Sequence, residues 1–245
     1  PRPPRSTPKP SSAASDVYKR QLPHIEIELD PLGAIVDVEH AAAEGAPLLH
    51  DNMSSNVLAE RKFSNGDAES AFACAAIKVG TRFRVRRKTP VAVEARVCAA
   101  EFDRGTQSLT LHSSTQVPGI IRDALAEILD MPGHRLRVIA PEVGGGFGAK
   151  VQAYAEDYVV AGLSKRLGIA LKWTEDRSEA FLATTHGRGI IGNIDIAATK
   201  TGKVLGVKLR LIADIGAYNT LFTAAIPTFT TLMANATYDI PAIRT

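Results

Sequence analysis

The sequence predicts an α+β fold in which mixed sheets pack against helices. Segments with alternating apolar residues are common, and two turns, at residues 103–106 and 201–202, are typical of β-hairpins. Residues 117–129 and 151–167 instead carry apolar residues at helical spacing. The strands before residue 141 are predicted to form hairpins, so nothing in the pattern indicates a doubly wound parallel sheet.

Residues 1–21 are predicted not to be native protein. Residues 11–21 can be back-translated to DNA that resembles a transposase-type sequencing adapter, and residues 2–7 resemble the flow-cell adapter that would precede it. The alternative is a disordered tail rich in proline and serine. The segment holds five basic side chains and one acidic, a net of +4, so the chain's total of +3 leaves −1 for residues 22–245. The positive total is therefore no sign of nucleic acid binding.

The elements between residues 22 and 130 are predicted from alternation and capping. Residues 25–36 alternate and then turn, and Asp67 lies in the first turn of a short helix over residues 67–76. Three strands and a helix follow, namely 78–87, 91–102, 108–113 and the helix 117–129, which Pro118 opens and whose Ala124, Leu125, Ile128 and Leu129 face inward.

The second half continues with strands at 135–140, 170–173, 190–198 and 204–214, and with the helix 151–167 that Gly168 ends. Residues 217–236 are apolar and irregular, and no lysine, arginine or histidine lies between Arg210 and Arg244. This segment is predicted to be buried, either as the lining of a pocket or as plain core.

Residues 141–150 are the most informative stretch of the chain. Four glycines within five positions free the backbone to approach a bound group and to adopt positive φ. With a strand before the turn and a helix after it, the pattern predicts an anion site at a helix N-terminus.

A dinucleotide-binding fingerprint is one interpretation of this loop. Gly144-x-Gly146-x-x-Ala149 satisfies it, and Glu175 or Asp176 would be placed to bind a ribose. Three residues separate the strand from the first glycine, however, whereas a Rossmann turn follows its strand directly. A nicotinamide-dependent dehydrogenase therefore stays an alternative.

A longer set of motifs resembles a known family. Residues 114–116 (Ser-Thr-Gln), the glycine loop and residues 173–178 (Trp-Thr-Glu-Asp-Arg-Ser) occur in the order seen in the large, molybdenum-binding subunit of the molybdenum hydroxylases. This family includes xanthine dehydrogenase, aldehyde oxidase and aerobic carbon monoxide dehydrogenase. Similar landmarks continue at 184–188, 213–218 and 238–244, so the resemblance covers the chain from about residue 22 to its end.

The resemblance implies how the chain is organised. Residues 22–56 are expected to be the C-terminal remnant of a preceding small α/β hammerhead domain plus a linker. Residues 57–245 are expected to be the first molybdopterin-binding domain, truncated at its C-terminal side. The family's general-base glutamate lies in a Gly-x-x-Gly-Glu stretch that does not occur here, so it is expected outside this chain.

The resemblance also implies the cofactor and partners. Molybdenum would be held by a molybdopterin, in the cytosine dinucleotide form, and not by protein side chains. The six histidines form no i, i+4 pair and the two cysteines no Cys-x-x-Cys pair, so no metal ligands are expected here. A [2Fe–2S] cluster and FAD are expected on an iron–sulfur small subunit and an FAD medium subunit. A cytoplasmic location with no membrane span is expected, and Cys74 and Cys98 are expected to be buried, reduced thiols.

The site residues implied by the resemblance are Gln116, Gly145, Gly146, Phe147 and Gly148. Gln116 would donate to an oxo or sulfido ligand of the metal, although an ordinary amide at a strand end is the alternative. Phe147 would cover the metal and pack on the substrate. The N–H groups of Gly146, Phe147 and Gly148 would reach the metal's oxygen ligands and the pterin.

Three further polar residues lie in or near the motifs of the resemblance. Lys150 would contact a phosphate or else lie solvated at the turn, whereas His186 is interpreted as a satisfied histidine and Arg188 as a surface residue.

The expected activity is hydroxylation of an aldehyde or N-heteroaromatic substrate, or oxidation of carbon monoxide, with water-derived oxygen. This fragment alone is expected to be inactive. Purine-oxidising members carry a glutamate where this chain has Val151, and an arginine in the segment that here spans 211–243, which has none. Purine oxidation is therefore disfavoured, and a non-catalytic scaffold paralogue stays a second alternative.

Overall fold

The computed structural model describes residues 24–245, and the adapter interpretation of residues 1–21 lies outside this range. The described residues divide into two units, with the boundary between Val36 and Asp37. In the first unit, residues 25–36 form neither strand nor helix, so the strand predicted there is wrong. A strand requires a neighbour for its ladder of hydrogen bonds, and residues 24–36 offer none. The boundary at residue 56 stays a prediction.

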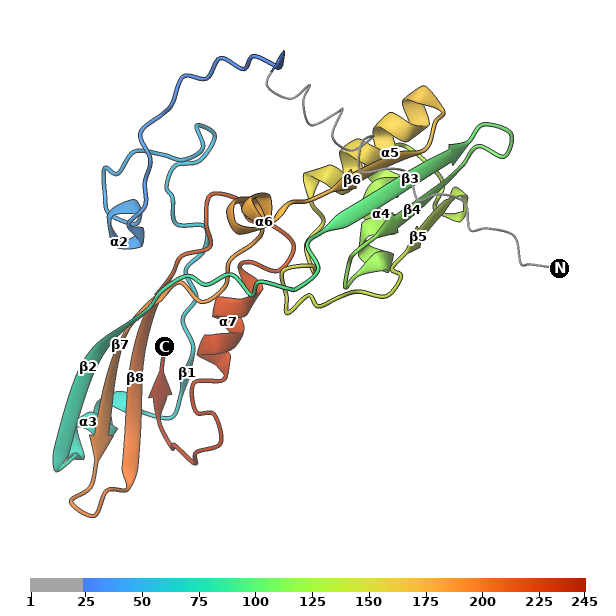
Figure 1. Cartoon of the computed structure of the whole chain (residues 1–245). Coiled ribbons are helices and arrows are strands. Elements are labelled where there is room, and N and C mark those ends of the chain that lie inside the picture. The colour runs from blue at the N-terminus through green and yellow to red at the C-terminus, as the bar shows by residue number, and fades with distance from the viewer. Residues whose placement is uncertain (1–23) are drawn as a thin grey trace. The chain divides into compact units, whose positions relative to one another are not determined.

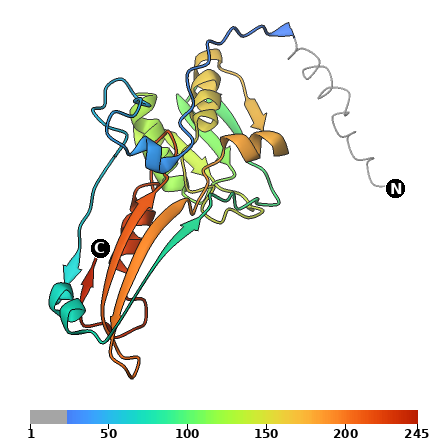
Figure 2. The same ribbon diagram turned by 90° about the vertical axis from the view of Figure 1, so that its left-hand side faces the viewer.

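In the second unit, one sheet has the strand order β1-β9-β8-β7-β2. Its three long strands, β2 (Ile77–Val85), β7 (Ile190–Ala198) and β8 (Val204–Ala213), pair antiparallel and lie side by side in both views (Figures 1 and 2). The short β9 (Ile243–Arg244) runs parallel to β8 and pairs with β1 (Ser64–Asn65). The long strands confirm the sequence prediction to within a few residues at their ends.

Helices α2 (Val38–Ala41) and α3 (Ala68–Cys74) accompany this sheet. The Asp67 carboxylate accepts the Ser70 N–H at 3.0 Å and caps α3, which confirms the predicted short helix. Arg84 of β2 reaches across to the Asp37 carboxylate that caps α2.

The apolar segment 217–236 differs from its prediction. It contains a helix, α7 (Ala225–Leu232), that contacts β8, and the large apolar side chains of Ile226, Phe229 and Leu232 are exposed. Burial was predicted because the segment lacks charge. Composition does not say whether another surface covers the segment, and none in the second unit covers these side chains.

The second sheet has the order β5-β4-β3-β6. β3 (Val97–Asp103) is antiparallel to β4 (Ser108–Ser113) and to β6 (Leu171–Thr174), whereas β4 is parallel to β5 (Leu136–Ile139). A short 3₁₀ turn, η2 (Gly133–Arg135), precedes β5. Both sheets therefore mix parallel and antiparallel pairs, as predicted.

Helices α4 (Pro118–Ile128) and α5 (Ala155–Leu167) pack on this sheet and enclose the main core (Figure 1). Leu109 and Leu111 of β4 meet Ile121 and Leu125 of α4, and all four are fully buried. The prediction that Ile128 faces inward is wrong, because its side chain is 58% exposed. Ile128 is the last residue of α4, and at this end of the helix the neighbouring Ala126 and Leu129 pack against the core instead.

Two elements begin later in the sequence than predicted, and both differences affect the geometry of the candidate site. β3 starts at Val97 because residues 91–96 leave the ladder, with Val91 at a φ of 48°. α5 starts at Ala155, after an irregular stretch at residues 151–154. The predicted anion site directly at a helix N-terminus is therefore wrong. The first turn of α5 also carries two acidic residues of its own.

The cysteines differ from each other. Cys98 is buried in the core, but Cys74 ends α3 and is exposed, so the predicted burial of Cys74 is wrong. Burial raises the pKa of the Cys98 thiol to about 12, and the nearby Asp157 and Glu156 carboxylates add to this shift. Within residues 24–245, no helix is both long and apolar enough to cross a bilayer.

We predict that iodoacetamide at pH 8 labels Cys74 in the folded protein but not Cys98. With a pKa near 12, roughly one Cys98 thiol in ten thousand is ionised at that pH, and the side chain is also shielded. Peptide mass spectrometry after timed labelling measures both rates. Both cysteines should react in denaturant, and equal rates in the folded protein would contradict the structure.

Candidate cofactor-binding site

The glycine loop, residues 141–150, requires small residues for two reasons. Gly145 and Gly148 have φ angles of 98° and 91°, which residues with a Cβ rarely adopt. Gly146 is buried, and a Cβ there would lie 2.4 Å from Gln116 Oε1. Glycine at this position therefore lets the loop backbone pack directly against the Gln116 side chain.

The structure brings three of the predicted site residues together. Gln116 Oε1 accepts the Gly148 N–H at 3.1 Å, beside Gly146. Because a backbone N–H can only donate, it faces the amide oxygen and leaves the Gln116 NH₂ group to donate elsewhere. The Gly148 N–H is thus used within the protein, and its predicted donation to a cofactor does not fit this arrangement.

Two neighbouring backbone donors of the loop stay available. In residues 24–245, neither the Gly146 N–H nor the Phe147 N–H meets a protein acceptor, whereas the Gly145 N–H donates to Val143 O at 2.9 Å. Phe147 has a φ of 49°, which is uncommon for a bulky residue, and its side chain is 76% exposed. The loop therefore presents two N–H groups and one aromatic ring.

Glu94 lies behind the loop and was missed by sequence reasoning. Its Oε2 accepts from the Gly144 N–H at 2.8 Å, from Lys150 Nζ at 2.7 Å and from Ser114 Oγ at 2.8 Å. Burial acts to raise the pKa of the Glu94 carboxyl, but the three hydrogen bonds outweigh it and hold the pKa below its usual value. Lys150 is buried in an ion pair with Glu94, so the predicted solvated lysine is wrong, whereas the predicted phosphate contact stays a prediction.

A second buried ion cluster centres on Arg96. Glu175 Oε1 lies 2.6 Å from Arg96 Nη2, and Glu175 Oε2 accepts the Arg96 backbone N–H at 2.9 Å. Glu156 Oε2 pairs with Arg96 Nη1 at 3.0 Å, and the guanidinium carbon lies 3.8 Å from the centre of the Tyr154 ring. Two carboxylates therefore bind the N–H groups of the guanidinium, and an aromatic ring covers one of its faces.

This cluster rules against the dinucleotide interpretation. Glu175 is buried against Arg96, and Asp176 caps helix α6 (Arg177–Ala183) in a capping box with Glu179. Neither acid is free to bind a ribose, and the loop follows the edge strand of a mixed sheet.

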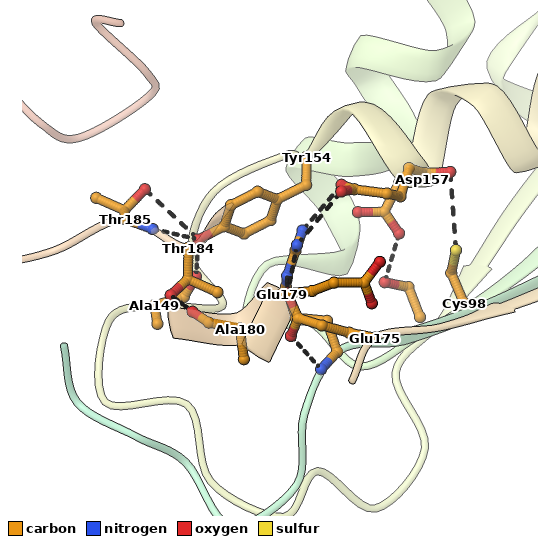
Figure 3. Close-up of polar contacts among 12 residues, drawn as sticks. Cys98, Ala149, Tyr154, Asp157, Glu175, Glu179, Ala180, Thr184 and Thr185 are labelled. Atoms are coloured by element: carbon orange, nitrogen blue, oxygen red, sulfur yellow. Dashed lines mark hydrogen bonds and ion pairs between the residues drawn. The ribbon is translucent and has the colours of Figure 1, made fainter. Parts of the chain in front are cut away.

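Tyr154 ties the end of the loop to another segment. Its hydroxyl donates to Ala149 O at 2.5 Å and accepts the Thr185 N–H at 3.1 Å; Figure 3 shows it directed toward both residues. Tyr154 falls within the helix predicted over residues 151–167, whereas in the structure it lies at the N-cap of α5. A hydroxyl with these two partners restrains the loop where it leaves toward the helix.

One sequence signal would have found the buried charges. Glu94, Arg96 and Cys98 alternate, so in a strand they share one face, and Cys98 was expected to be buried. Two charged residues on a buried side require partners, because an unpaired charge is costly to bury. The alternation of Glu94, Arg96 and Cys98 therefore indicates buried or partly buried ion pairs.

The remaining candidates have ordinary roles. His186 Nε2 lies 3.0 Å from Phe181 O, and Arg188 is exposed, which agrees with the interpretations made of both. In the part of the chain that the structure describes, no three histidine, cysteine or acidic side chains gather as a metal site.

Comparison with known proteins gives the family. The molybdopterin cofactor-binding domain family matches residues 49–245. The carbon monoxide dehydrogenase large chain of Afipia carboxidovorans is 34% identical over 208 residues, which are 80% of this chain and 26% of that protein. The nicotine 6-hydroxylase large subunit of Paenarthrobacter nicotinovorans is 32% identical over 232 residues, 94% of this chain and 28% of that protein.

The solved structures agree. Quinoline 2-oxidoreductase from Pseudomonas putida 86 superposes with a TM-score of 0.85 at 30% identity, covering 94% of this chain and 30% of that one. The fold and loop thus define a cofactor-binding domain. The chain belongs to the molybdopterin cofactor-binding domain family, among the large subunits of molybdenum hydroxylases. It spans between a quarter and a third of the length of these relatives, and the nicotinamide alternative is wrong.

We predict that Glu175→Gln lowers the free energy of unfolding of the full-length protein by about 3 kcal/mol, because it leaves the buried Arg96 guanidinium short of a charge partner. The matched control is Glu179→Gln, which should cost less than about 0.5 kcal/mol since glutamine also serves the capping box. Denaturant unfolding of both variants measures the difference. Equal stability of the two would contradict the role given to the Arg96 cluster.

Proposed function

We propose that the full-length protein is a molybdopterin-dependent hydroxylase and that Gln116 and the glycine loop bind its cofactor. The observation that carries this proposal is the packing of Gln116 on Gly146, with the amide oxygen fixed by the Gly148 N–H. This arrangement sets the orientation of the Gln116 NH₂ group before any ligand binds. Such preorganised donors are effective because they need no reorganisation when charge develops.

The residues present fit molybdopterin with its molybdenum. The Gln116 NH₂ group and the N–H groups of Gly146 and Phe147 would hold the oxygen or sulfur ligands of the metal and the pterin. A carboxamide suits this task because it donates without adding a charge. When bound, the cofactor supplies the redox centre at which water-derived oxygen is added to the substrate. Gln116 and Phe147 are the catalytic residues in this proposal.

Phe147 would act on the substrate side. Phe147 is 76% exposed, so the described part of the chain does not use it for core packing. An exposed aromatic face beside preorganised donors can exclude water from the reaction centre and pack on a planar or apolar substrate.

The substrate class follows from relatives and from two positions. The named relatives act on carbon monoxide, nicotine and quinoline. We infer an N-heteroaromatic compound, an aldehyde or carbon monoxide as substrate. Val151 after the lysine and the lack of arginine in residues 211–243 disfavour a purine.

The rest of the assembly is also a proposal. We infer an iron–sulfur small subunit with [2Fe–2S] and an FAD medium subunit as partners, and the cytosine dinucleotide form of the cofactor. Relatives are named as large chains or subunits, which supports a multi-subunit enzyme. Residues 22–56 and 57–245 would be the hammerhead remnant with its linker and the first molybdopterin-binding domain. The base glutamate would lie outside this chain, and two unpaired cysteines favour the cytoplasm.

The direct test is to purify the full-length protein with its genetic neighbours and to measure bound molybdenum, released pterin nucleotide, and turnover of the three substrate classes. Stoichiometric molybdenum with turnover of one class is the expected result. A well-folded protein without molybdenum would contradict the proposal and favour a non-catalytic scaffold.

We predict that Gly146→Ala lowers kcat/KM of the full-length enzyme by about 100-fold, because the new Cβ would displace the Gln116 amide. Gly119→Ala in α4 is the matched control, since nothing lies within 4 Å of a Cβ there and alanine favours a helix. Steady-state kinetics on both variants gives the comparison. Equal activity of the two would show that the contact between Gly146 and Gln116 does not matter.

A further inference from the structure

The segment that leads into β3 holds the glycine loop from behind through one side chain. Glu94 Oε2 accepts from the Gly144 N–H and from Lys150 Nζ, which bracket Gly146 and Phe147, at 2.8 and 2.7 Å. The Glu94 backbone N–H also donates to Gly144 O at 3.2 Å. A single residue therefore fixes both ends of the stretch that carries the free N–H groups.

The same carboxylate oxygen reaches the strand end that carries Gln116. Ser114 Oγ donates to Glu94 Oε2 at 2.8 Å, two residues before Gln116. Lys150 adds a second connection, because its carbonyl oxygen accepts the Gln116 N–H at 2.9 Å and Thr115 Oγ1 at 3.2 Å. Glu94 is thus joined to both partners of the contact between Gln116 and the loop.

Burial makes this arrangement hard to replace. The Lys150 side chain is only 2% exposed and that of Glu94 33%, so the lysine has little access to water. A Cβ on Gly144 would lie 2.6 Å from Glu94 Cβ, so the loop backbone rests directly on the glutamate. Glycine is therefore required at position 144 by the contact with Glu94, and not by contact with a ligand.

We propose that Glu94 is a positioning residue that holds the glycine loop and Gln116 in the geometry that binds the cofactor. This inference rests on the proposed function, because it assigns a role toward the same cofactor. A merely structural ion pair could be exchanged for apolar residues of similar size without moving the loop. A positioning residue could not, because the Gly144 N–H and the Ser114 hydroxyl would lose their acceptor.

The test uses the full-length protein carrying Glu94→Met/Lys150→Met, which removes both charges at similar volume. The matched control is Glu69→Met/Lys208→Met, which removes another glutamate–lysine pair, with the same 2.7 Å separation, at the surface of the other sheet. The first readout is amide hydrogen exchange of the peptide covering residues 141–150, followed together with the melting temperature. We expect loop exchange to be at least about tenfold faster in the first variant and unchanged in the control.

The second readout is bound molybdenum and the Mo(V) electron paramagnetic resonance spectrum after dithionite reduction, which needs no known substrate. We expect lower occupancy or a changed spectrum in the Glu94 variant only. Should the double variant not fold, Glu94→Gln, which keeps the size and one acceptor, replaces it, and its loop exchange should still be faster than that of the wild type.

Unchanged loop exchange in folded Glu94 variants would overturn the inference, as would faster exchange with wild-type occupancy and spectrum. Wild-type protein that binds no molybdenum would instead refute the proposed function, while the exchange data would still decide whether Glu94 fixes the loop.

Discussion

The ion pair between the buried Lys150 and the half-buried Glu94 is the interaction on which the glycine loop depends. An ammonium group removed from water must keep its carboxylate, and this requirement brings the two ends of the loop to one oxygen atom. The loop backbone then has no room for a Cβ at Gly144 against Glu94 or at Gly146 against Gln116. In the sequence these glycines indicated backbone freedom. In the fold, glycine at positions 144 and 146 is required by close packing.

A second restraint acts where the loop leaves toward α5. Arg96 is enclosed by Glu175, Glu156 and the Tyr154 ring. The Tyr154 hydroxyl donates to Ala149 O (Figure 3). Residues 91–96 do not continue β3, and this irregular stretch supplies Glu94 and Arg96 to these clusters. The cost of shortening a strand is offset by two sets of charge-assisted hydrogen bonds. The free N–H groups of the loop therefore lie between two restrained ends.

Local patterns predicted much of the fold, because strand alternation, hairpin turns and the capped helix at Asp67 depend on neighbouring residues. The segments that failed, 25–36 and 217–236, depend on which surfaces meet them, and that information is not local. At the site, motif resemblance placed Gln116 beside the glycines. The partners of Glu94 and Arg96 lie 20 to 79 residues away, so sequence spacing could not pair them. The alternation of Glu94, Arg96 and Cys98 was the only local signal of buried charge.

The central claim is that the loop and Gln116 form a preorganised set of donors for one cofactor. The most direct measurement is a high-resolution structure of the full-length protein with its cofactor bound. The account predicts that Gln116 Nε2 and the N–H groups of Gly146 and Phe147 lie about 2.7–3.2 Å from cofactor atoms, with the loop backbone unchanged. A cofactor held elsewhere, with these donors facing water or another protein segment, would contradict it.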